Sequence, residues 1–176
     1  REYQGPLRWL DEAMIVNIAR NTTEPSPALT LNLDDRRLKC YLMDTGLLIN
    51  LSFGDGNYID NDLYNAILTD RLHVNEGMFV ENVIAQCLRI NGHKIVFYVE
   101  YDKNGNMLLE IDFLIRKDKK VIPIEAKSGE KYTIKSLEKF KKKFSNKIGL
   151  QYVLHEGDIK RENEILYFPY YIASIL

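Results

Sequence analysis

Met107-Leu-Leu-Glu-Ile-Asp-Phe-Leu-Ile115 and Val121-Ile-Pro-Ile-Glu-Ala-Lys127 are the two stretches that decide the fold of this chain. Both are short and rich in apolar and β-branched residues, and the charged segment Arg116-Lys-Asp-Lys-Lys120 joins them. This pattern is typical of two strands connected by a turn. We therefore expect an antiparallel hairpin.

The hairpin has a preferred register. A turn centred between residues 118 and 119 pairs Arg116 with Val121, Asp112 with Glu125, and Glu110 with Lys127. Side chains alternate along a strand, so one face is expected to be apolar. Its members are Ile111, Phe113, Ile115, Ile122, Ile124 and Ala126. A slip of one residue would exchange the two faces, so the apolar set fixes the register and gathers the charged residues on the other face.

Asp112 and Glu125 are expected to face each other, and like charges in opposed positions destabilise a sheet. Two compensations stay open. Lys127 can form salt bridges on a solvated face, or a divalent cation can lie between the two carboxylates. Mg²⁺ and Mn²⁺ prefer oxygen ligands, commonly one or two carboxylates completed by water and phosphate. In that case Lys127 would stand beside the attacking water and orient it.

Asp112, twelve intervening residues and Glu125-Ala126-Lys127 together resemble the D…(D/E)-x-K signature of the PD-(D/E)xK nuclease superfamily. The surrounding phrases extend this resemblance: Tyr41-Leu-Met-Asp-Thr-Gly-Leu-Leu48, Gly77-Met-Phe-Val-Glu-Asn-Val-Ile-Ala85, Glu110-Ile-Asp-Phe113 and Pro123-Ile-Glu-Ala-Lys-Ser-Gly129. In this order and spacing they resemble the C-terminal domain of unknown function attached to bacterial and archaeal AAA-type ATPases. The resemblance runs from about Tyr41 to Phe144.

The resemblance implies an α/β fold, with a restriction endonuclease-like αβββαβ core and a mixed sheet. It also implies a third carboxylate on the helix before the sheet, a position that Glu81 occupies. As a nuclease, the domain would hold Mg²⁺ or Mn²⁺ with Asp112, Glu125 and the Ala126 carbonyl, and would hydrolyse DNA phosphodiester bonds with the help of Glu81 and Lys127. As the alternative, it is a silent DNA-binding or protein-binding regulatory module of an ATPase. Homodimerisation, frequent among related nucleases, is also open.

The residues themselves also favour a helix around Glu81. From Met78 to Ile90 an apolar stripe recurs at helical spacing: Phe79, Val80, Val83, Ile84, Cys87 and Leu88. Asn91-Gly92 then provides a good C-terminal stop. Glu81 lies at the edge of the stripe, where it can either reach the hairpin or meet only solvent.

The remaining segments complete the expected order α-β-β-β-α-β. Further strands are expected over 94–101, 149–154 and 165–168, a second helix over 133–144, and a surface loop over 158–164. Nearer the N-terminus we expect a helix over 7–19 and strands over 28–33 and 38–43. We interpret residues 1–43 as a partial winged-helix-like segment, the end of an upstream module, and residues 44–176 as the nuclease-like domain. Packing of the N-terminal segment on the main core is the alternative.

Lysines are concentrated on the second expected helix and are candidate DNA contacts: Lys135, Lys139, Lys141, Lys142 and Lys143. In a nuclease they would contact phosphates and make binding depend steeply on salt. The alternative is an ordinary solvated helix face.

Composition limits the remaining options. The 176 residues fit one domain with a proper core, and a net charge of −1 gives no global reason for nucleic-acid binding. Cys40 and Cys87 stand in apolar contexts and are expected to be buried and reduced, as in a cytoplasmic protein. No run is long and apolar enough for a membrane span, and no Gly-x-x-x-x-Gly-Lys-[Ser/Thr] phosphate loop occurs, so we expect any ATP site in a missing upstream part.

Overall fold

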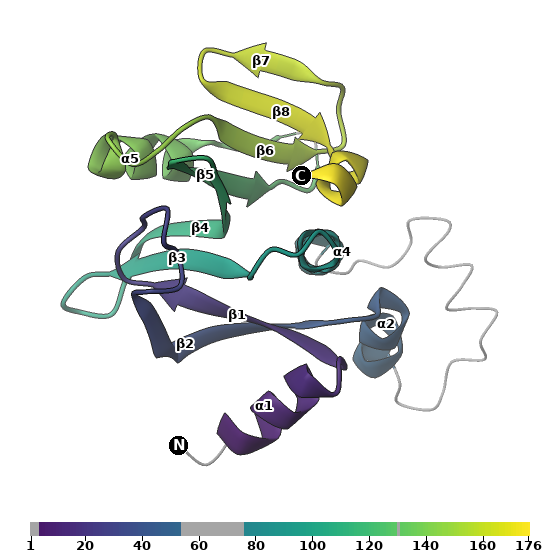
Figure 1. Ribbon diagram of the computed structural model, residues 1–176. Coiled ribbons are helices and arrows are strands. Elements are labelled where there is room, and N and C mark those ends of the chain that lie inside the picture. Colours follow the sequence, from purple (N-terminus) through teal and green to yellow (C-terminus); the bar gives the residue numbers. More distant parts are fainter. Residues whose placement is uncertain (1–3, 54–75, 130) are drawn as a thin grey trace.

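The computed structural model describes residues 4–53, 76–129 and 131–176. Strands from all three ranges form one eight-stranded mixed sheet in the order β2-β1-β3-β4-β5-β6-β8-β7 (Figure 1). The strands are β1 (Val16–Thr22), β2 (Leu33–Leu42), β3 (Val96–Tyr101), β4 (Met107–Lys117), β5 (Lys120–Ala126), β6 (Gln151–His155), β7 (Lys160–Glu162) and β8 (Ile165–Pro169). The helices are α1 (Gln4–Glu12), α2 (Thr45–Phe53), α4 (Glu76–Ile90), α5 (Lys135–Phe144) and the 3₁₀ helix η1 (Tyr170–Ile175). The expected α/β class with a mixed sheet is confirmed.

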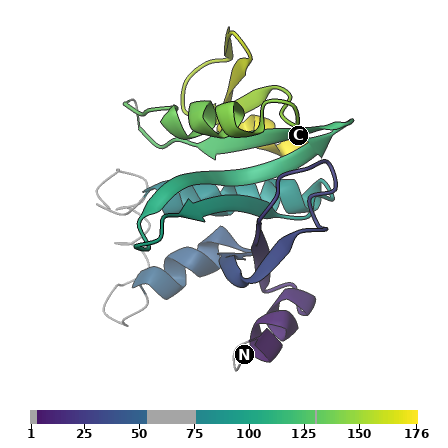
Figure 2. The same cartoon turned by 90° about the vertical axis from the view of Figure 1, so that its left-hand side faces the viewer.

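Helices cover both faces of the sheet, with α4 on one side and α5 on the other (Figures 1 and 2). Each helix buries its apolar stripe in a separate core. Ile84 and Leu88 of α4 pack with Phe113 and Ile124 of the hairpin. On the opposite face, Leu137 and Phe140 of α5 pack in a second core with Leu114 and Val121 of the hairpin. Because both faces are covered, the hairpin lies in the interior of the molecule.

The predicted hairpin register is confirmed over its paired part. β4 and β5 are antiparallel, and the pairs run from Lys117 with Lys120, through Arg116 with Val121, to Phe113 with Ile124. Beyond that pair a side-chain contact continues the association, because the Ala126 N–H donates a hydrogen bond to the Asp112 carboxylate at 2.9 Å. β5 then pairs with β6 in parallel, with α5 as the crossover between them.

The expected apolar face of the hairpin was wrong at one residue. Ile111 belongs to the α5 core, whereas Phe113 and Ile115 belong to the α4 core. The pairing of β4 with β3 shifts by one residue between Ile111 and Leu114, which marks a β-bulge at this place. A bulge puts an extra residue into one strand, so the alternation of side chains changes beyond it.

The N-terminal segment differs from the expected helix and strand boundaries. Helix α1 ends at Glu12, Met14 has a left-handed φ of 55°, and the residues from Val16 onward form β1. The strand expected over 28–33 is wrong, since residues 28–32 form bends and turns and β2 begins only at Leu33. β1 pairs with β3 as well as with β2, so residues on both sides of position 43 contribute to one sheet. The division into two modules at residue 43 stays a prediction.

Two smaller expectations also need correction. The loop expected over 158–164 contains the short strand β7, which pairs with β8, although its residues are exposed as expected. Cys40 is exposed rather than buried, while Cys87 is partly buried, and both are free thiols. In the described parts of the chain, no helix combines the length and apolarity that crossing a bilayer requires.

Candidate active site

Acidic side chains from three elements converge beside the bulge in β4. Glu110 and Asp112 lie on β4, Glu125 lies near the end of β5, and Glu81 projects from α4. Three of them meet the Lys39 ammonium of β2, which lies 2.8 Å from Glu110, 3.4 Å from Glu81 and 3.9 Å from Asp112, and Glu125 lines the same cavity as Asp112. The structure therefore brings together Glu81, Asp112 and Glu125, which were all expected in the site.

Helix α4 is held in the position that aims Glu81 at this cluster. The buried Asn82 accepts a hydrogen bond from the Leu42 N–H at 2.7 Å and donates to the Leu42 carbonyl at 3.1 Å and to Thr45 Oγ1 at 3.2 Å. These bonds link α4 to the end of β2 and to the start of α2. The neighbouring Glu81 then accepts a hydrogen bond from the Tyr41 hydroxyl at 3.0 Å.

Tyr41 connects the cluster to the core of the α4 face. Its ring packs against Phe113, with 5.6 Å between the ring centroids. Burial and the negative charge of Glu81 raise the pKa of Tyr41 far above its ordinary value. The hydroxyl therefore stays protonated and serves as a hydrogen-bond donor.

Glu125 and Lys127 form an ion pair at the end of β5. The Glu125 side chain is only 3% exposed, and its Oε2 receives the Lys127 ammonium. Its other oxygen, Oε1, is buried and has no hydrogen-bond partner among the described residues. A buried carboxylate oxygen without a partner is costly, so the site has an unused capacity to bind a donor or a cation.

The electrostatics of the cluster disfavour ionised carboxylates. Burial, followed by repulsion from Glu125 and Glu81, raises the pKa of Asp112 to about 8, despite the opposing effects of Lys39 and the Ala126 N–H. Burial also raises the pKa of Glu125, against the opposing attraction of Lys127. Burial alone would lower the pKa of Lys127, but its attraction to Glu125 outweighs this and raises it. Strongly shifted carboxyl groups in a concave site are typical of functional positions.

A cavity of about 210 Å³ gives access to these groups. Its lining includes Glu110, Asp112, Glu125 and Lys127 together with Ser136 from the first turn of α5. The carboxylates and the lysine of the predicted signature thus share one opening. A small ligand can reach both.

The donor set suits a hard cation only in part. Among the described residues, no three His, Cys, Asp or Glu side chains are arranged as a ready metal site. Instead, three of the carboxylates, those of Glu81, Glu110 and Asp112, converge on Lys39. Asp112 and Glu125 remain a pair of carboxylates of the kind that holds Mg²⁺ with several waters, and the unpartnered Glu125 Oε1 is a fitting ligand.

The candidate DNA contacts on α5 differ in their availability. Lys141 forms an ion pair with Glu164, and Lys143 lies 2.5 Å from Glu100. The exposed Lys139 donates to the Leu108 carbonyl at 3.4 Å, next to the cavity, whose lining also includes Leu108. The other two candidates, Lys135 and Lys142, are exposed.

Sequence reasoning missed Lys39, Tyr41 and Ser136 as parts of the site. Lys39 and Tyr41 are two residues apart on β2, so they project from the same face of that strand. That spacing was a usable signal, but only the fold shows that this face meets the β4 carboxylates.

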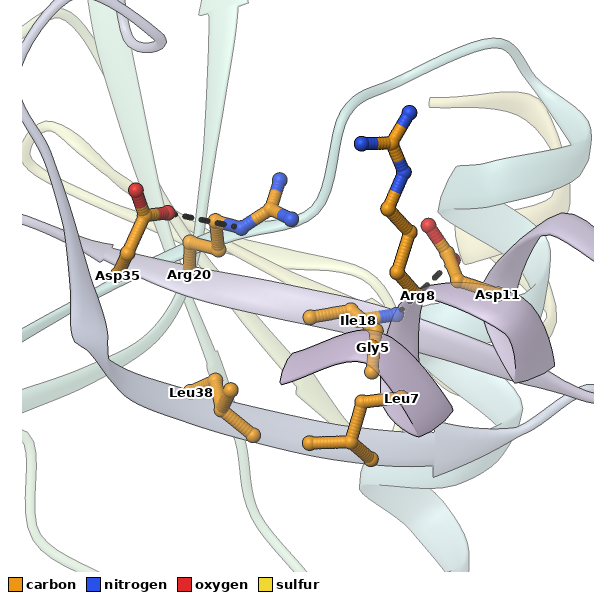
Figure 3. A pocket seen from close by; sticks show the side chains of 8 residues that line it. All are labelled: Gly5, Leu7, Arg8, Asp11, Ile18, Arg20, Asp35 and Leu38. Carbon is orange, nitrogen blue, oxygen red and sulfur yellow. Dashed lines mark hydrogen bonds and ion pairs between the residues drawn. The ribbon is translucent and has the colours of Figure 1, made fainter. Parts of the chain in front are cut away.

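A second hollow, of about 360 Å³, lies between α1, β1 and β2 and contains none of these residues (Figure 3). Figure 3 shows the ion pair of Arg20 with Asp35, at 3.2 Å, and the hydrogen bond from the Ile18 N–H to Asp11, at 3.4 Å. Arg8 and Leu38 also line it. Its charges are of both signs, so it offers no clear preference for an anion or a cation.

Comparison with known proteins gives one match. No curated protein and no solved structure matches the chain. A family model described as "Domain of unknown function (DUF4143)" matches residues 76–171, more than half of the chain, and this range contains Glu81, Asp112, Glu125 and Lys127. The expected resemblance to a domain of unknown function is confirmed to this extent, and the chain belongs to the DUF4143 family.

Proposed function

We propose that the cluster around Asp112, Glu125 and Lys127 is a divalent-metal site that hydrolyses phosphodiester bonds in DNA. The single observation that carries the proposal is Glu125 Oε1, a buried carboxylate oxygen with no hydrogen-bond partner in the described part of the chain, beside a second carboxyl group of strongly raised pKa. Lys127 pairs with Glu125 and Lys39 lies 3.9 Å from Asp112, yet the pKa values of both carboxyl groups stay raised, so a further cation would stabilise the two groups as anions.

The arrangement of elements supports the proposal. The order α4-β3-β4-β5-α5-β6, with β3, β4, β5 and β6 adjacent in the sheet and β5 parallel to β6, agrees with a restriction endonuclease-like core. The carboxylates lie where β4 and β5 cease to pair. From the resemblance to the C-terminal domain of AAA-type ATPases, we also propose that an ATPase module accompanies this domain in the same protein.

Each residue has a distinct role in this proposal. The carboxylates of Asp112 and Glu125 and the carbonyl of Ala126 would hold Mg²⁺ or Mn²⁺. When bound, the ion would neutralise charge on the phosphate and make water a better nucleophile. Lys127 would orient the attacking water, and Glu81 would assist by accepting a proton from it. The water oxygen then bonds to phosphorus as the opposite P–O bond breaks, and the leaving oxygen takes up a proton from solvent.

The test combines metal binding with cleavage. Calorimetric titration of Mn²⁺ is compared between the wild type and the Asp112→Ala/Glu125→Ala double variant, and branched and linear DNA are incubated with each protein in the same buffer. We expect Mn²⁺ binding and metal-dependent cutting in the wild type and neither in the double variant. Absence of both in the wild type would refute the proposal.

The second candidate function is a silent DNA-binding or protein-binding module on the same scaffold. One observation favours it: the Lys39 ammonium already pairs with three carboxylates of the cluster, those of Glu81, Glu110 and Asp112. This candidate predicts that Lys127→Ala leaves partner affinity unchanged. Equal DNA binding by the wild type and the Asp112→Ala/Glu125→Ala double variant, with no cutting by either protein, would support it.

A further inference from the structure

Lys39 is a second cation of the acidic cluster, beside the Lys127 that pairs with Glu125. Its ammonium contacts three carboxylates from two elements, Glu110 and Asp112 of β4 and Glu81 of α4. Its side chain is 24% exposed, so these ion pairs are partly shielded from water. Because less water surrounds the partly buried Lys39 ammonium, its attraction to the carboxylates is screened less than it would be at the surface.

The same ammonium stands close to the proposed metal ligands. It lies 3.9 Å from Asp112 Oδ1, and Asp112 and Glu125 line one cavity. If Asp112 held a divalent cation, this cation and the Lys39 ammonium would be close neighbours, and both carry positive charge. Each therefore reduces the affinity of the carboxylates for the other.

A neighbouring groove gives Lys39 a place to which it can withdraw. A cavity of about 610 Å³ lies beside the cluster and is lined by Lys39, Phe97, Tyr101, Lys103 and Glu110, among others. The Lys39 ammonium is 5.4 Å from the centre of the Phe97 ring, which offers it a cation–π contact on this side. Lys39 already makes this contact while it is paired with the carboxylates, and the groove, which Arg36, Arg37 and Lys103 also line, gives its side chain room to move away from them.

We propose that Lys39 is a resident counter-ion of the carboxylate cluster, which competes with the divalent cation and must withdraw toward the Phe97 groove before the metal binds tightly. This inference rests on the proposed metal site and adds to it a control on metal affinity. Lys39 is a positioning residue here, since it acts through the ligands rather than on the substrate.

The test is a calorimetric titration of metal-free protein with Mn²⁺ alone. Lys39→Met removes the competing charge and is expected to bind Mn²⁺ at least tenfold more tightly than the wild type, with a larger Mn²⁺-dependent rise in Tm. Lys103→Met is the matched control, because it removes one exposed positive charge from the same groove. Its Mn²⁺ affinity should stay close to that of the wild type.

The possible failures are distinguishable. If the wild type binds Mn²⁺ and Lys39→Met binds it equally or more weakly, the competition is refuted while the metal site stands. If neither protein binds Mn²⁺, the metal site and the competition are both refuted. Lys39→Gln is made as a second variant in case Lys39→Met does not fold, because its amide removes the charge but can still donate a hydrogen bond to Glu110.

Discussion

Asp112→Asn tests the electrostatics of the cluster through its effect on stability. The substitution removes an ionisable group and keeps the shape of the side chain. The amide oxygen can still accept the hydrogen bond from the Ala126 N–H, and the amide nitrogen can donate to neighbouring carboxylates. We expect the metal-free wild type to become less stable than Asp112→Asn as the pH rises.

The direction follows from the pKa of Asp112, which is about 8 in the folded protein against an ordinary value of 3.8. A carboxyl group with a raised pKa in the folded state binds its proton more tightly there than in the unfolded chain. Its contribution to stability is therefore complete below the unfolded pKa and is lost as the pH rises through the folded pKa. Each pKa unit corresponds to about 1.4 kcal/mol. Between about pH 5 and about pH 7, the wild type should lose up to about 3 kcal/mol of unfolding free energy that Asp112→Asn keeps.

Urea denaturation with EDTA at these two pH values measures the difference. Asp158→Asn serves as the control, because it removes a carboxylate from an exposed position. Its stability should follow the wild type across the same range. If Asp112→Asn also runs parallel to the wild type, Asp112 ionises normally in the folded protein and the argument for a cation-demanding site is wrong.

Three further variants test the scaffold and the DNA interface. Asn82→Ala removes two hydrogen bonds from α4 to Leu42 at the end of β2 and one to Thr45 at the start of α2, and should lower the unfolding free energy by about 2 kcal/mol in urea denaturation. Phe113→Ala empties a fully buried position and should cost about 3–5 kcal/mol in the same assay, with an effect below 1 kcal/mol arguing against the core described above. Lys142→Glu should weaken DNA binding and lower the slope of log affinity against log salt by about 1 or more. Lys141→Glu should have a smaller effect, because Lys141 is already paired with Glu164. Equal effects of the two variants in a fluorescence-anisotropy titration would contradict this ranking.

The hairpin could be predicted from sequence because its signal is local. Its charged turn and β-branched runs specify strands, and the apolar alternation specifies the register, as the pairing of Arg116 with Val121 confirms. Helix α4 was likewise predictable from its apolar stripe and from Gly92, which has the left-handed φ of 84° that a helix stop favours. In both places the local preference and the tertiary structure agree.

Prediction failed where tertiary pairing decides the conformation. The first part of β1, residues 16–19, was interpreted as the end of a helix, and the strand contains buried polar residues that hide its alternation. Asn21, for example, accepts a hydrogen bond from the Val99 N–H at 2.9 Å, a contact that only the neighbouring strand supplies. The bulge that moves Ile111 to the other core and the approach of Lys39 to β4 are equally non-local. No spacing within either segment specifies them.

The position of β1 in the sheet decides where this chain can be cut to give a stable fragment. A fragment cut to the matched range 76–171 would lack β1, β2 and with them Lys39 and Tyr41. In such a fragment Glu81 would lack its tyrosine donor. β3 would become an edge strand, because its residues Val96 and Phe97 pair with β1 in the full chain. Exposed apolar edges recruit other chains, so such a fragment should self-associate in solution. Expression boundaries for this chain are therefore better set ahead of β1 than at residue 76, where the family match begins.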